Sequence, residues 1–243
     1  TTNYQLRLTV IMRLNIFSLS IILLAVLLPA HLLHAQQSEE MLLFEIDDNE
    51  YKKCNYNKEG ELESFQKLLV GSIEENDETY RLPVELYSYN AEGELQDSTK
   101  TLYTCRPDEQ QVLLNVFPFT DYDKGSEIKV NLLDSKTFYP ISPEPGWEMK
   151  PIEFALNIDK GLVGFLGGKS KITIYERRVV SNDTLQTGQY QINSEVDLGV
   201  YVLGIKMKGF GYSVIEIIDK DRGIIWQKFT SEDDDSYFVI RLI

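Results

Sequence analysis

The stretch YRLPVELYSYNAEGELQDS, from Tyr80 to Ser98, contains the pattern that decides the fold. In its first half, Leu82, Val84 and Leu86 alternate with charged and polar residues. This period of two is typical of an antiparallel strand with one buried face. The alternation stops at residues 90–93, Asn-Ala-Glu-Gly, whose residue types favour a turn. The stretch therefore predicts a strand that leads into a hairpin.

The turn at the centre of this stretch occurs twice. The frame Tyr-Asn-x-Glu-Gly-Glu-Leu occupies residues 56–62 and again residues 89–95. In both copies Asn is the first turn residue and Gly the fourth, which predicts a type I turn that closes into a bulge. Asn then bonds its own backbone, and Gly takes the positive φ. We interpret the repeat as hairpin architecture, and two such hairpins predict one sheet that keeps adding strands.

Parts of the sequence resemble calcium-binding and phosphate-binding loops, but each lacks a required residue. Residues 121–125 and 219–223 begin like calcium loops, but each has Gly where the third ligand belongs. In GLVGFLGGKS, residues 161–170, Val163 stands where a phosphate-binding loop needs Gly, and a strand-like run follows instead of a helix. The sequence therefore predicts no metal site and no cofactor.

The beginning of the chain has the pattern of a secretory signal peptide. Met-Arg at 12–13 precedes an apolar run over residues 14–28, and the eleven residues before this Met are an over-extended start. We predict cleavage after Ala35, so that residues 1–35 are removed and residues 36–243 form a single β-barrel-like domain, periplasmic or on the outer surface. A retained membrane anchor is the alternative, but polar residues and a proline interrupt the apolar run. Once cleaved, the protein is not expected to be integral to the membrane.

Cleavage also changes the chemistry available to the chain. It leaves 22 basic residues against 38 acidic ones, so the net charge goes from −14 to −16. Nucleic acid and anionic membrane surfaces are poor partners for such a chain. Cleavage removes His31 and His34, which are the two histidines of the sequence. Ser-His-Asp and Cys-His catalysis and His-ligated zinc are thereby excluded, and we predict that the protein is not an enzyme.

The two cysteines, Cys54 and Cys105, are a disulfide candidate, because a pair in an oxidising compartment tends to be joined. Against a bond, the two residues lie on non-neighbouring strands if the first hairpins form a simple meander, and a disulfide needs Cα atoms within ~7 Å. Both alternatives stay open at the level of sequence. A reactive thiol is disfavoured, since no histidine can lower its pKa.

The whole chain has about twelve strand-like runs and no capped amphipathic helix after the signal peptide, which predicts an all-β fold. We expect an antiparallel meander forming a barrel or a strongly curved half-barrel of about ten to twelve strands. The conspicuous irregular segment is YPISPEPGWEMKP, residues 139–151, which holds half of the eight prolines. It is either a linker between two small β domains or a loop over the mouth of a barrel, and we favour the loop.

The order of these features resembles the TapB-like family, bacterial exported β-proteins of largely unknown function. The resemblance rests on the signal peptide, the two hairpins, the strand ending at Cys105, the Pro-rich middle and the late hairpin KGFGYSVIEIIDKDRGIIWQKF. It covers most of residues 49–229, and this chain adds TSEDDDSYFVIRLI, residues 230–243, to the shorter ending of the family. The resemblance implies a periplasmic or outer-surface barrel in a Gram-negative cell and implies no reaction.

Three functions are compatible with these observations. The first is a non-catalytic envelope protein that binds an apolar or amphipathic, lipid-like ligand in its curved sheet, with Trp147, Leu162 and Phe165 as pocket candidates. Trp147 lies in the Pro-rich segment, and the other two lie in a Gly-rich stretch too apolar for an ordinary loop. The second is an assembly protein that binds an envelope protein through sheet edges. The third, less favoured, is a carboxylate-based hydrolase.

Overall fold

The computed structural model describes residues 48–75, 79–106, 127–134, 139–158, 169–202 and 205–243. The chain divides into two compact units, residues 1–40 and 41–243, and every described residue belongs to the second. Leu162 and Phe165, two of the predicted pocket residues, lie outside the described residues. The described part of the chain contains no helix with the length and hydrophobicity needed to cross a membrane.

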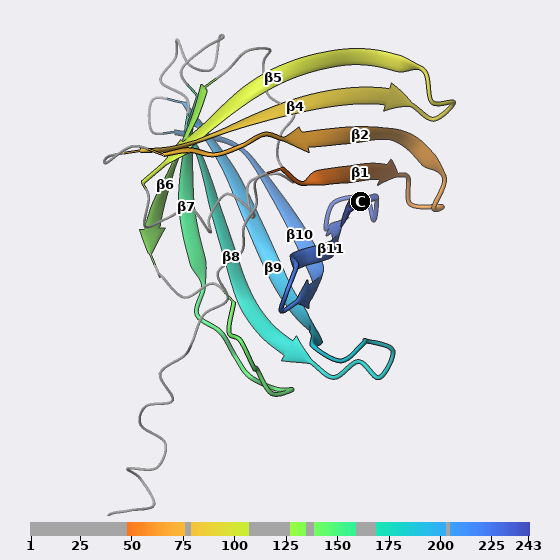
Figure 1. Cartoon of the computed structure of the whole chain (residues 1–243), viewed down its shortest axis with the longest axis vertical. Helices are drawn as coiled ribbons and strands as arrows, with labels where there is room; N and C mark the ends of the chain where they lie inside the picture. The colour runs from red at the N-terminus through yellow and green to blue at the C-terminus, as the bar shows by residue number, and fades with distance from the viewer. Residues whose placement is uncertain (1–47, 76–78, 107–126, 135–138, 159–168, 203–204) are drawn as a thin grey trace, which may run out of the picture. The chain divides into compact units, whose positions relative to one another are not determined.

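Strands account for the regular structure of the described residues, which confirms the predicted all-β class (Figure 1). Alternation of apolar and polar side chains makes each strand two-faced, so the strands are stable only where they share a covered face. In chain order they are β1 (Glu50–Tyr56), β2 (Leu62–Val70), β3 (Glu74–Glu75), β4 (Tyr80–Asn90), β5 (Leu95–Cys105), β6 (Glu127–Asp134), β7 (Ile152–Ile158), β8 (Lys169–Val180), β9 (Gln189–Val202), β10 (Ile205–Asp219), β11 (Gly223–Ser231) and β12 (Tyr237–Leu242).

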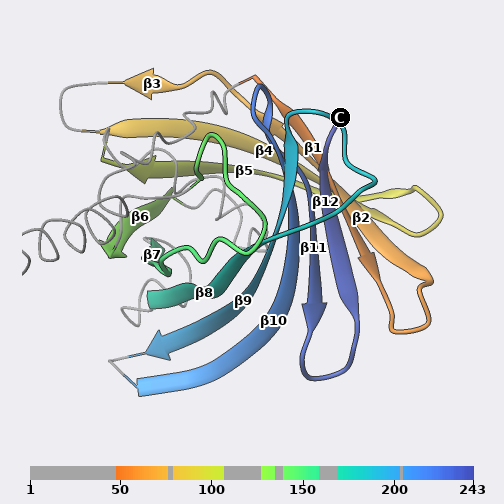
Figure 2. The same ribbon diagram turned by 90° about the horizontal axis from the view of Figure 1, so that it is seen from below.

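The strands form one sheet in the order β2-β1-β12-β11-β10-β9-β8-β7-β6-β5-β4-β3. β2 also pairs with β4, which joins the two ends of this order and closes a barrel; β3 stands outside the ring, so eleven of the twelve strands form it. All neighbours are antiparallel except β5 and β6, which run parallel over Leu102–Thr104. Figure 2 shows β1, β2, β4 and β5 curving over one side and β8 to β10 over the other. The predicted barrel is confirmed, with one parallel pair in it.

The hydrophobic core lies inside this barrel, because alternate residues of each strand point inward. The face predicted from the sequence of β4 is the buried one, since Leu82, Val84 and Leu86 are all buried. Side chains from the other strands complete the core, among them Leu68, Tyr103, Ile128, Phe154, Leu156, Ile172, Ile192, Val214, Phe229 and Ile240.

Both copies of the repeated frame form the predicted hairpin turn. Gly60 and Gly93 have φ angles of 85° and 86°. In each turn the backbone amide four positions after the Asn donates to the Asn side-chain oxygen at 2.8 Å. One turn joins β1 to β2 and the other joins β4 to β5. The repeat is therefore architectural, as its residue types predicted.

The candidate disulfide is not formed in the structure. Cys54 lies on β1 and Cys105 lies at the end of β5, with β2 and β4 between these strands. They are also offset along the strands, because Cys54 stands opposite Phe65, which stands opposite Tyr89, which in turn stands opposite Leu95 at the start of β5. A disulfide needs Cα atoms within ~7 Å, a condition that this register does not meet.

Candidate functional site

The Pro-rich segment between β6 and β7 lies against the second half of β8. Three backbone hydrogen bonds of 2.8 to 2.9 Å fix it there, from Gly146 N to Val179 O, from Val179 N to Trp147 O and from Met149 N to Arg177 O. Residues 146–149 thus extend the sheet just before β7 begins. Because β6 and β7 pair directly with one another, the segment is not a linker between two separate sheets.

β8 contains a bulge at the point where this segment lies against it. The register of β8 against β9 shifts between Tyr175 and Arg178, so Glu176 and Arg177 together stand opposite Ser194. Glu176 has a φ of 51°, a left-handed conformation that is uncommon for a residue with a side chain. Bulges redirect side chains, and here Arg177 is 1% exposed whereas Glu176 is exposed.

Arg177 belongs to a buried polar network inside the barrel. Its guanidinium carbon lies 5.4 Å from the centroid of the Tyr139 ring, and its Nη1 donates to the Lys150 carbonyl at 3.1 Å. The Tyr139 hydroxyl donates to Glu216 Oε1 at 3.3 Å, and Gln227 Nε2 donates to the same oxygen at 2.7 Å. Buried polar groups are tolerated when they are hydrogen-bonded in this way. We interpret the network as a structural part of the core.

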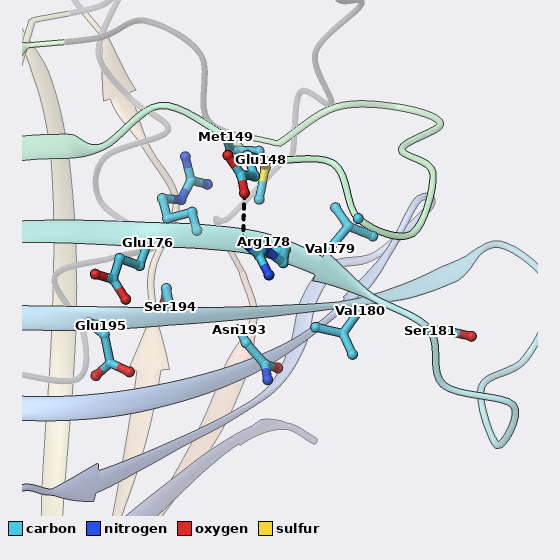
Figure 3. Close-up of a pocket in the computed structure, with 12 residues that line it drawn as sticks. Glu148, Met149, Glu176, Arg178, Val179, Val180, Ser181, Asn193, Ser194 and Glu195 are labelled. Carbon is cyan, nitrogen blue, oxygen red and sulfur yellow. Dashed lines mark hydrogen bonds and ion pairs between the residues drawn. The ribbon is translucent and has the colours of Figure 1, made fainter.

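A pocket of about 890 Å³ lies at the β8 bulge (Figure 3). Part of its wall is apolar and comes from Met149, Val179 and Val180. Another part is acidic, with Glu176 on β8 and Glu195 on β9. Figure 3 shows these two carboxylates pointing to the same side of the sheet from neighbouring strands. Of the apolar lining residues, Val180 points to this same side in Figure 3, whereas Val179 points to the core. The side of the pocket with the two carboxylates therefore combines a small apolar surface with a pair of negative charges.

Two oxygens in the wall of the pocket are buried and have no hydrogen-bond partner, namely Ser194 Oγ and Glu195 Oε2. Ser194 is only 4% exposed and points to the core side of β9, whereas Glu195, the next residue, points to the other face. A buried polar atom without a partner costs about 1–3 kcal/mol. Such atoms are rare in folded proteins, and a bound ligand that supplies the missing partner is one physical reason for them.

The arginines of the pocket already have acceptors within the protein. Arg177 donates to a backbone carbonyl, and Arg178 Nη2 lies 2.6 Å from Glu148 Oε1 in an exposed ion pair. Glu176 and Glu195 form no ion pair with any residue of the described part of the chain. The lining holds three acidic residues, Glu148, Glu176 and Glu195, against these two arginines, so its net charge is negative.

The negative charge of the pocket affects the pKa of Glu195. Burial raises the pKa of its carboxyl, a hydrogen bond from Ser213 at 3.4 Å opposes the rise, and the neighbouring carboxylates of Glu232 and Glu176 add to it. A nearby cation would favour the ionised form and reverse the rise. Within the described ranges, no group of three or more His, Cys, Asp or Glu residues is placed to hold a metal ion.

Of the three predicted pocket residues, Trp147 is the one that can be located. It is half-buried and packs against the core, between Gly146 and Glu148, which line the pocket. Its own side chain is not part of the lining, so its role in a pocket stays a prediction.

The residues that do form the pocket were not predicted. In the structure the buried residues of β8 change from even positions at Ile172 and Ile174 to odd positions at Arg177 and Val179, as an extra residue in a bulge requires. The sequence does not show this change, because Arg177 is charged and the next two apolar residues, 179 and 180, are both valine.

Comparisons with known proteins identify no family for this chain. No family model matches it, and no curated protein matches it. One similar solved structure is a protein from Bacteroides fragilis described as exported and as having a YmcC-like fold, with 11% identity and a TM-score of 0.47, covering 83% of this chain and 97% of that chain. Another is a protein from Parabacteroides distasonis described as a lipoprotein, with 10% identity, a TM-score of 0.47 and the same coverage. Similarities this distant do not support an argument about function, and the TapB-like resemblance stays a prediction.

Proposed function

We propose that this protein is a non-catalytic binding protein of the cell envelope, and that it holds a small amphipathic ligand with a positively charged head in the pocket at the β8 bulge. The observation that carries the proposal is Glu195 Oε2, a buried carboxylate oxygen that has no hydrogen-bond partner and lies in the wall of a pocket with net negative charge. A ligand ammonium group brings several hydrogen-bond donors and a positive charge, which are the two things that this oxygen lacks.

The rest of the pocket fits the two ends of such a ligand. Glu176 and Glu195 supply negative charge on one side, where the head would lie. Val180, which points to the same side of the sheet in Figure 3, supplies an apolar surface for a short aliphatic part. The volume of about 890 Å³ is within the range of about 300–1,000 Å³ that small-molecule sites occupy.

The envelope location in this proposal rests on the sequence. The predicted signal peptide over residues 1–35 would direct the chain out of the cytoplasm, and cleavage after Ala35 would leave a chain without histidine. Without imidazole, the common acid-base and nucleophilic mechanisms lack a component, which supports a binding role over catalysis. Assembly through a sheet edge has less support, because the β2–β4 pairing closes the barrel.

The test uses a matched pair of probes that differ in the charge of the head. Octylamine and octanoate are titrated by calorimetry into protein purified after export. We expect saturable binding of octylamine and none of octanoate. Glu195→Gln should weaken octylamine binding at least about tenfold, because a charge-assisted hydrogen bond is replaced by a neutral one. Glu92→Gln, in the exposed β4–β5 turn, serves as the control.

Three results would overturn the proposal: no octylamine binding, equal binding of both probes, or octylamine binding that Glu195→Gln leaves unchanged. Ser194→Ala is a further control, because Ser194 points to the opposite, buried face of β9. It should leave octylamine binding unchanged.

A further inference from the structure

Away from the pocket, the end of the β9–β10 hairpin exposes apolar side chains next to lysines. Ile205 and Met207 are each 66% exposed, and Lys206 and Lys208, which alternate with them, are exposed as well. Scattered exposed apolar residues are normal on protein surfaces. Two large ones within three residues, at the end of a hairpin, form a local patch that indicates a contact.

The fold keeps these four residues at the rim of the barrel. β9 and β10 are the two longest strands of the described structure, with 14 and 15 residues. Their ends lie at the periphery of the barrel in Figure 2, where Ile205 pairs with Val202. The register shifts between Lys206 and Lys208, so Met207 is the extra residue of a bulge. Its side chain is therefore not committed to a cross-strand neighbour.

The charge of this region differs from that of the rest of the chain. Residues 198–215 contain two lysines and no acidic residue, although the whole sequence has 38 acids among 243 residues. Lys206 Nζ lies 3.4 Å from Asp197 Oδ2 in an exposed pair, which leaves the lysine accessible to other anions. Lys208 Nζ lies 4.2 Å from the centroid of the Phe210 ring. The hairpin end is thus a small positive and apolar area on a strongly acidic protein.

We propose that the end of the β9–β10 hairpin docks on an anionic lipid surface. Ile205 and Met207 would enter the boundary between headgroups and acyl chains, while Lys206 and Lys208 would contact lipid phosphates. Apolar side chains flanked by lysines, with an aromatic ring behind them, are the residues that such interfaces favour. The inference does not depend on the ligand pocket, because it uses none of the same residues.

Net charge alone predicts that anionic membranes repel this protein, and the hairpin end is the local exception, because its two lysines outnumber the single acid, Asp197, that pairs with Lys206. Within a Debye length of about 8–10 Å a surface interacts with the nearest charges and not with the whole molecule. Repulsion of the remaining acidic surface would then orient the barrel with this end toward the lipid. A second copy of the chain fits less well, since four side chains fall far short of the ~800 Å² per partner of a stable interface.

The experiment is a flotation assay with phosphatidylcholine vesicles, with and without phosphatidylglycerol. The protein is purified after export, and mass spectrometry confirms that it begins at Gln36, so the apolar residues 14–28 are absent. We expect flotation only with phosphatidylglycerol. The double variant Lys206→Gln/Lys208→Gln should bind about 30-fold more weakly, which is the expected loss for two lysines near an anionic surface. Ile205→Ser/Met207→Ser should abolish flotation.

Leu95→Ser is the matched control. Leu95, beside the β4–β5 turn, is a large apolar residue that is 56% exposed but lies outside the patch. It should float like the wild type. Equal flotation with both kinds of vesicle, or equal flotation of all variants, would overturn the proposal. So would a protein that forms dimers and loses them in Ile205→Ser/Met207→Ser without binding vesicles, because the occupant of the patch would then be a second copy.

Discussion

Glu216 shows what a single ionisable residue contributes inside this barrel. It is buried among neighbouring strands, accepts hydrogen bonds from Tyr139 and Gln227, and is influenced by the charge of Arg177. Burial raises the pKa of its carboxyl, although the charge of Arg177 and the two hydrogen bonds oppose this rise. The folded protein therefore takes up a proton at Glu216 more readily than the unfolded chain does. Its contribution to stability is largest when it is protonated and falls as the pH rises through the raised pKa.

Replacement of Glu216 by Gln should remove this pH dependence, since Gln has nearly the same size and still accepts from Gln227. The free energy of unfolding, measured in urea between about pH 4 and pH 8, should fall with rising pH more steeply in the wild type than in Glu216→Gln. Glu216→Leu should cost about 1–3 kcal/mol, because the buried Gln227 Nε2 loses the acceptor that it has at 2.7 Å. Parallel pH curves for the wild type and Glu216→Gln would show that the carboxyl does not titrate differently on folding.

At the scale of elements, the two hairpin turns show why one sequence frame is used twice. A type I turn with a following bulge requires a residue at positive φ, and Gly60 and Gly93 fill that position in both hairpins. A Cβ atom added to Gly93 would meet nothing within 4 Å. Any cost of a side chain there is therefore a backbone cost and not a steric clash with the rest of the protein.

Gly93→Ala should destabilise the protein by about 1–2 kcal/mol, the penalty for a left-handed conformation in a residue with a side chain. Ala91→Gly, in the same exposed turn, should change stability by less than about 0.5 kcal/mol and is the matched control. Both values follow from urea unfolding monitored by tryptophan fluorescence. Equal values for the two variants would mean that the turn relaxes into a different conformation and that the Gly of the frame has no special role.

At the scale of the whole molecule, alternation predicted the strands and their buried faces but could not predict which strands are neighbours. A period of two fixes the face of a strand and carries no information about its partner. The pairing of β1 with β12 and of β2 with β4, which closes the barrel, therefore had to come from the structure. The pocket was missed for a related reason, because it depends on a shift of register that brings Glu176 next to Ser194. Trp147 was singled out for its loop and lies beside the pocket wall.

Strand β12 joins β1 to β11 in the barrel, and Ile240 tests its importance. Ile240 is 3% exposed and pairs with Lys53 of β1 on one side and Gln227 of β11 on the other. Ile240→Ala should cost about 2–5 kcal/mol, whereas Arg241→Ala, at the next and exposed position, should stay within about 0.5 kcal/mol. Urea unfolding should show one transition in both variants, shifted only in Ile240→Ala, because a closed barrel unfolds as a unit. If instead the main transition of Ile240→Ala coincided with that of Arg241→Ala, β12 would be an appendage on an open sheet, and the barrel would not depend on it for closure.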